Sequence, residues 1–183
     1  MSNATRILAA LPALLLLALV ARPARADLMP EREVKKIRKA FKTTKTAALY
    51  RTEVVVNAGG DPGPAIGPFG KKITFHWEWI PGEKPALRRA ELEGMAGTHS
   101  YRRDYLFAGK GQLLFALRRE PAAADPGKDV TERLYFYNGS VFRYLKGKTS
   151  TDEIGEEISM IAGEEEIGAE TLLKIFNGLR EVQ

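Results

Sequence analysis

Between Lys72 and Lys146 apolar and polar residues alternate with a period of two, the pattern of β-strands buried on one face. Asn138-Gly139, between two alternating aromatic runs, is a strong hairpin signal because both residues accept positive φ. Gly109 and Gly111 mark a looser turn of the same kind. The pattern predicts an antiparallel meander with strands at about 72–80, 87–94, 101–108, 112–119, 131–137 and 140–146.

Segments of helical spacing flank this region. A helix is predicted from Glu31 to about Tyr50, followed by a β-branched strand over 51–57. Near the other end, Ser150 and Glu153 form a capping box for a short helix that Gly163 is expected to end, and a second helix is predicted over 169–179. The fold class expected is α+β: an N-terminal helix, an antiparallel meander of about six or seven strands, open or curled into a half-barrel, and C-terminal helices packed on one face.

Residues 1–26 have the features of a cleavable export signal. Arg6 precedes an apolar run of about 15 residues, shorter than the roughly 20 that a spanning helix needs, and Ala24-Arg25-Ala26 provides a cleavage pattern before Asp27. The mature chain is then a single α+β domain over 27–183, periplasmic or secreted, and the composition of the signal favours a bacterial source. The cysteine count of 0 excludes disulfides and thiolate metal sites.

Charge is unevenly distributed along the chain. Three of the 28 basic residues lie in the predicted signal, which leaves 25 basic and 23 acidic residues. The segment from Thr149 to Gln183 holds nine acidic and two basic residues. We call this segment the acidic arm, and expect it to pack across the basic remainder of the mature chain, 27–148. Its carboxylates are expected to be exposed or in the turn between its helices. The alternative is a partner protein that recognises one of the two charged surfaces.

The predicted N-terminal helix has a cationic face: Lys35, Lys36, Arg38, Lys39, Lys42 and Lys45. It could bind lipid headgroups or nucleic acid, or it could be a solvated face that completes ion pairs within the fold. We favour ion pairing, because the apolar stripe of the helix lacks Trp and Leu and suits docking on a sheet. Nucleic acid is not an expected partner of an exported protein, and contact with a membrane surface is not favoured.

The stretch ITFHWEWIP, Ile73 to Pro81, raises the question of an active site. In a strand, His76 and Glu78 lie on one face and Trp77 and Trp79 on the other. A zinc site from His76, Glu78, His99 and Asp104 is conceivable across neighbouring strands, but no HExxH or other ligand-spaced cluster is present. We therefore interpret the stretch as an amphipathic strand and predict no catalytic residue, metal ion or cofactor.

Three arginine doublets, Arg88-Arg89, Arg102-Arg103 and Arg118-Arg119, each direct one side chain to each face of a strand. With the tyrosines of the later strands they could bind an anionic ligand. We favour cross-strand ion pairs instead, formed with Glu91, Glu93, Asp104, Glu132 and the acidic arm.

No motif assigns a family. The layout of signal, helix and meander is broadly similar to that of exported bacterial proteins of unassigned function, and loosely to that of half-barrel carriers of outer-membrane lipoproteins. The first hypothesis is a non-enzymatic exported binding protein for an unknown partner protein or a small apolar ligand. It would use the glycine-rich loop over 58–72 and a sheet face, with candidate ligand-binding residues His76, Trp77, Glu78, Trp79, Arg102, Tyr135 and Tyr137.

Two other functions stay open. One is a carrier that holds an apolar or amphipathic ligand between a curved sheet and its helices, in a cavity lined by Phe75, Trp77, Trp79, Phe107 and Phe115. The other, less favoured, is a metal-dependent hydrolase around His76, which requires His76, Glu78 and His99 to lie within reach of one another.

Overall fold

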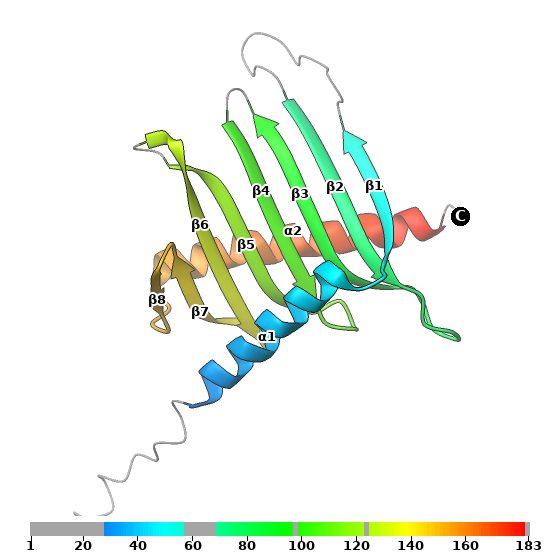
Figure 1. Ribbon diagram of the computed structural model, residues 1–183, viewed down its shortest axis with the longest axis horizontal. Helices are drawn as coiled ribbons and strands as arrows, with labels where there is room; N and C mark the ends of the chain where they lie inside the picture. The colour runs from blue at the N-terminus through cyan, green and yellow to red at the C-terminus, as the bar shows by residue number, and fades with distance from the viewer. Residues whose placement is uncertain (1–27, 57–68, 97–98, 123–124, 182–183) are drawn as a thin grey trace, which may run out of the picture.

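A computed structural model describes residues 28–56, 69–96, 99–122 and 125–181 (Figure 1). The predicted export signal and positions 58–68 of the predicted glycine-rich loop lie outside these residues. The elements in chain order are α1 (Leu28–Thr46), β1 (Tyr50–Val56), β2 (Phe69–Glu78), β3 (Ala86–Ala96), β4 (His99–Phe107), β5 (Leu113–Ala122), β6 (Asp125–Tyr137), β7 (Ser140–Lys146), β8 (Thr149–Thr151) and α2 (Glu156–Glu181).

The eight strands form one antiparallel sheet in chain order, so the predicted α+β class and meander are confirmed. The sheet is open, with β1 and β8 at its edges, and does not form the half-barrel that the sequence left open. The Asn138-Gly139 turn between β6 and β7 is present, with φ of 51° and 78°. The strand that prediction missed is β8, which has only three residues and follows a turn at Gly147. Ser150 belongs to β8, so the predicted capping box at this position was wrong.

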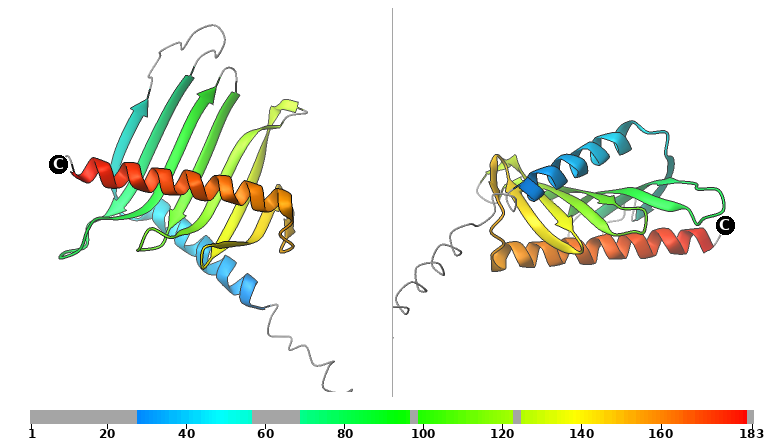
Figure 2. Two further views of the ribbon diagram at one scale, coloured as in Figure 1. Left: turned by 180° about the vertical axis from the view of Figure 1, so that it is seen from behind. Right: turned by 90° about the horizontal axis from the view of Figure 1, so that it is seen from below.

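The two helices lie on opposite faces of the sheet, as the view from below shows (Figure 2). We name these faces the α1 face and the α2 face. On the α2 face the core includes Phe75, Leu134 and Phe136 from the sheet and Leu172 and Phe176 from α2. The α1 face has a smaller core, in which Val34 and Ile37 of α1 pack against Leu106, Phe115 and Tyr135. The sheet is therefore the middle layer of three.

The C-terminal region is one continuous helix of 26 residues, so the prediction that Gly163 ends a helix was wrong. Gly163 does not have the positive φ of a helix-ending glycine. Ala162, Ala169, Leu172 and Phe176 are all buried, and continuous burial along one side of α2 offsets the low helix propensity of its glycines.

Candidate functional site: a cationic groove beside α1

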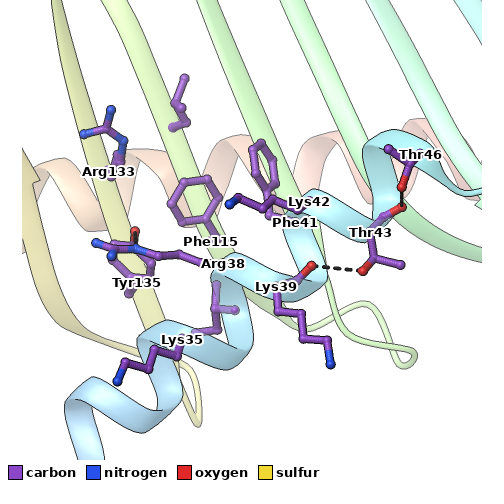
Figure 3. A pocket seen from close by; sticks show the side chains of 12 residues that line it. Lys35, Arg38, Lys39, Phe41, Lys42, Thr43, Thr46, Phe115, Arg133 and Tyr135 are labelled. Atoms are coloured by element: carbon purple, nitrogen blue, oxygen red, sulfur yellow. Dashed lines mark hydrogen bonds between the residues drawn. The ribbon is translucent and has the colours of Figure 1, made fainter.

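An open groove of about 700 Å³ runs between α1 and the sheet (Figure 3). The groove volume falls in the range of about 300–1,000 Å³ that is usual for small-molecule sites. The residues that line it come from one flank of α1 and from β5 and β6: Lys35, Ile37, Arg38, Lys39, Phe41, Lys42, Thr43, Thr46, Phe115, Leu117, Arg133 and Tyr135.

Aromatic rings form the floor of the groove. The rings of Phe41 and Phe115 have centroids 4.9 Å apart, and those of Phe115 and Tyr135 are 5.1 Å apart. Alternation along β5 puts Phe115 and Leu117 on the α1 face, and register pairs Phe115 with Tyr135 of β6. Because α1 crosses only part of this face, some of this apolar surface borders the groove instead of the helix.

Positively charged side chains border these aromatic rings. The Arg38 Nε donates a hydrogen bond to the Tyr135 hydroxyl at 3.0 Å, and its guanidinium lies 5.7 Å from the ring centroid. Arg133 donates from Nη1 to the Gly147 carbonyl at 3.3 Å. Among the residues that the structure describes, no carboxylate lies within 4.0 Å of the charged groups of Arg38, Lys42 or Arg133. These three cations are therefore available to an anion in the groove.

The arginine doublets are different, because every one of the six is ion-paired. Arg89 donates to both oxygens of Asp104, at 2.6 and 2.8 Å, and both side chains are almost fully buried. The remaining pairs are Arg88 with Glu78, Arg102 with Glu91 and Glu93, Arg103 with Glu120 and Glu165, Arg118 with Glu132, and Arg119 with Asp129. The predicted ion pairing of the doublets is thus confirmed, with Glu78, Glu120 and Asp129 as partners in addition to the predicted ones.

His76 and Glu78 belong to this ion-pair network and do not form a metal site. His76 Nε2 lies 2.8 Å from Glu91 Oε1, whereas Glu78 accepts from Arg88 Nε at 2.7 Å. The carboxylate of Glu91 is half-buried. Burial alone would raise its pKa, but the charges of Arg89 and Arg102 together with its interactions with His76 outweigh burial and lower it.

His99 cannot join His76. In register, His76 is opposite Arg89 and Arg89 is opposite Leu106, whereas His99 starts β4 seven residues earlier. At about 3.3 Å per residue, His99 lies roughly 23 Å along the sheet from Leu106, the β4 residue in line with His76. The conceivable zinc site is therefore not formed, and the described part of the chain holds no cluster of three metal-ligating side chains. His76 and His99 therefore do not lie within reach of each other, as a metal-dependent hydrolase around His76 would require.

A second polar cluster lies on the α2 face, around a carboxylate predicted to be exposed. Glu165 is only 2% exposed, and its Oε1 lies 3.1 Å from Arg103 Nη1 and 3.5 Å from Arg118 Nε. Burial raises the pKa of Glu165, and the arginine charges oppose this rise without cancelling it. The acidic arm does pack on basic residues of the same chain, but it does so on the face opposite α1.

Of the seven residues predicted to bind a ligand, Tyr135 lines the groove. His76, Glu78 and Arg102 are occupied by the ion pairs described above. Trp77 lies on the α2 face, where its Nε1 donates to Thr52 Oγ1 at 3.1 Å, while Trp79 and Tyr137 are exposed and lie outside the groove.

The cavity expected for a carrier is also placed differently. Phe75 and Phe107 are packed in the core of the α2 face, whereas Phe115 lies on the α1 face, so the five predicted aromatic residues cannot line one cavity. Prediction missed Phe41, Lys42 and Arg133 as groove residues. The signal available for the first two was the amphipathic pattern of the helix, in which Phe41 belongs to the apolar stripe and Lys42 to the cationic face beside it.

The chain was compared with known protein families, curated proteins and solved structures. No family model, no curated protein and no solved structure matches the chain. Among the helices that the structure describes, none is long and apolar enough to span a membrane.

Proposed function

We propose that this chain is an exported, non-enzymatic binding protein, periplasmic or secreted, that holds an amphiphile with an anionic head group in the groove beside α1. One observation carries the proposal: an aromatic floor is bordered by Arg38, Lys42 and Arg133, which lack carboxylate partners among the described residues. All six doublet arginines, in contrast, are paired within the fold.

The chemistry of the groove matches the two ends of such a ligand. Phe41 and Leu117, which are partly exposed beside the buried rings of Phe115 and Tyr135, provide apolar contact for an alkyl or aromatic portion. The ammonium of Lys42 and the guanidinium of Arg133 can each donate a charge-assisted hydrogen bond to a carboxylate, sulfate or phosphate. Because the groove is open to solvent, the ligand does not need to be fully enclosed.

The test compares two fluorescent probes that differ only in charge, 11-(dansylamino)undecanoic acid and its methyl ester. We expect the acid to bind tightly enough to titrate and the ester to bind more weakly. A charge-assisted hydrogen bond contributes about 1.5–3 kcal/mol, so losing one corresponds to roughly 10- to 100-fold in affinity.

Three variants locate the site. K42Q/R133Q should weaken binding of the acid and leave binding of the ester nearly unchanged, and L117E should weaken binding of both probes because it puts a charge on the floor. The control K84Q/K174Q removes the same charge from exposed positions away from the groove. Equal affinity for acid and ester, or equal losses in K42Q/R133Q and the control, would refute the proposal.

Native mass spectrometry of the purified protein complements the titration. An excess mass that denaturation removes, and that K42Q/R133Q no longer retains, would identify the natural ligand. A second protein chain in that spectrum, with no small molecule, would favour a protein partner instead.

A further inference from the structure

The outward side of α1 is a continuous basic stripe. Arg32, Lys35, Lys36 and Lys39 are spaced i, i+3, i+4 and i+7, so they follow one side of the helix over about 10 Å, and all four are exposed. Figure 3 shows the side chains of Lys35 and Lys39 extending away from the rings of the groove floor. The stripe is thus a surface separate from the floor, although these two lysines stand at the outer edge of the groove.

Most of this positive charge is uncompensated. Lys36 Nζ lies 2.7 Å from Glu33 Oε1, but within the described ranges Arg32, Lys35 and Lys39 have no carboxylate within ion-pair distance. The other acidic residue of α1, Glu31, pairs with Arg143 of β7. The sequence favoured internal ion pairs for this face, and the structure provides one for Lys36 alone among the four residues of the stripe.

The opposite side of the molecule carries the opposite charge. The exposed residues of α2 include Glu156, Glu157, Glu164, Glu166, Glu170 and Glu181, against one exposed lysine, Lys174, which pairs with Glu170. Since α1 and α2 cover opposite faces of the sheet (Figure 2), the protein has a positive and a negative side. Near an anionic surface this asymmetry orients α1 toward the surface and α2 away from it.

We propose that the basic stripe of α1 docks the protein on an anionic lipid bilayer. The contact is electrostatic and peripheral, because Val34 and Ile37, the apolar side of α1, are already buried against the sheet and cannot insert between lipids. Docking on a bilayer would also bring the edge of the groove close to a source of anionic amphiphiles. A bilayer fits better than a nucleic acid, because the stripe contains no aromatic side chain on which a base could stack.

The experiment is sedimentation of the purified protein with vesicles of phosphatidylcholine alone or with about one third phosphatidylglycerol. We expect attachment only to the anionic vesicles, and its loss as salt is raised from roughly 50 to 300 mM, because screening shortens the reach of surface charges. Each lysine or arginine near an anionic bilayer contributes about 1 kcal/mol, so R32Q/K36Q should weaken attachment about 30-fold. K84Q/K174Q, with the same change in net charge, should attach like the native protein.

The result can be separated from that of the groove. R32Q/K36Q, which leaves every groove-lining residue in place, should keep its affinity for the dansyl acid, whereas K42Q/R133Q should keep most of its vesicle attachment. Equal attachment to neutral and anionic vesicles, or equal losses in R32Q/K36Q and K84Q/K174Q, would overturn the docking proposal. So would tighter binding of a short DNA duplex than of the anionic vesicles, since it would assign the stripe to a nucleic acid.

Discussion

The glycines of α2 allow a sharp test of how this helix is packed. A Cβ added at Gly163 meets no atom within 4 Å, whereas a Cβ at Gly168 would lie 2.9 Å from the hydroxyl oxygen of Tyr105. That hydroxyl cannot move freely, because the Tyr105 side chain is buried and hydrogen-bonded to Glu165. The same substitution at two positions of one helix should therefore change stability in opposite directions.

For Gly163→Ala, the gain in helix propensity is about 0.5–1 kcal/mol and nothing opposes it. We expect the free energy of unfolding to increase by about that amount, which corresponds to a rise in Tm of roughly 1–4 °C for a chain of this length. Gly168→Ala has the same gain in propensity, but overpacking against Tyr105 costs about 1–3 kcal/mol. Because the propensity term cancels between the two variants, Gly168→Ala should be about 1–3 kcal/mol less stable than Gly163→Ala.

Denaturant unfolding followed by far-ultraviolet circular dichroism measures both changes, and an unchanged m-value would show that the comparison is of native-state stability. Destabilisation of more than about 1 kcal/mol by Gly163→Ala would refute the continuous helix, since alanine is unfavourable at a helix-ending position with positive φ. Equal stabilisation by both substitutions would refute the close contact between Gly168 and Tyr105.

Two further predictions concern the buried charges. Asp104→Ala leaves the buried Arg89 with Glu91 at 3.0 Å as its remaining carboxylate partner. The free energy of unfolding, measured with urea, should fall by about 3 kcal/mol, the lower end for a broken buried pair, whereas R89M/D104L should lose much less. A loss below about 1 kcal/mol in Asp104→Ala would contradict a buried pair. Because the pKa of Glu165 is raised above 4.5 in the folded state, its contribution to stability is present in acid and is lost as pH rises through the folded-state pKa. Glu165→Gln should therefore gain stability relative to the native protein as pH rises above about 4.5, and a difference independent of pH would contradict the raised pKa.

The sheet could be predicted from sequence because its signals are local. The alternation between Lys72 and Lys146 reflects burial on one face, and Asn138-Gly139 specifies a turn in its own two residues. The continuity of α2 could not be predicted in this way. Whether Gly163 ends or continues a helix depends on the core that Leu172 and Phe176 bury, and that core lies on strands far away in the sequence.

The groove shows the same division between local and distant information. The amphipathic pattern of α1 predicts which residues face the sheet, but not that the helix leaves Leu117 partly exposed beside the buried ring of Phe115. Arg133 joins the groove only because the register between β5 and β6 sets it opposite Leu117. Alternation within a single strand instead favoured His76 and Glu78 as ligand-binding residues. In the structure Glu91 contacts His76, and Arg88 pairs with Glu78.

The basic residues of this chain indicate a binding surface only once their ion pairs within the fold are known. In composition, the arginines of the doublets and the cations of α1 are the same kind of feature, and both were assigned to internal ion pairs. Register decides between them: β3, β4, β5 and β6 set carboxylates beside the doublets, whereas the sheet residues that border the groove beside α1 are Phe115, Leu117, Arg133 and Tyr135, none of them acidic. Unpaired positive charge therefore remains on α1 and at Arg133 of β6, around the groove, and there a ligand or a surface of opposite charge gains most from binding.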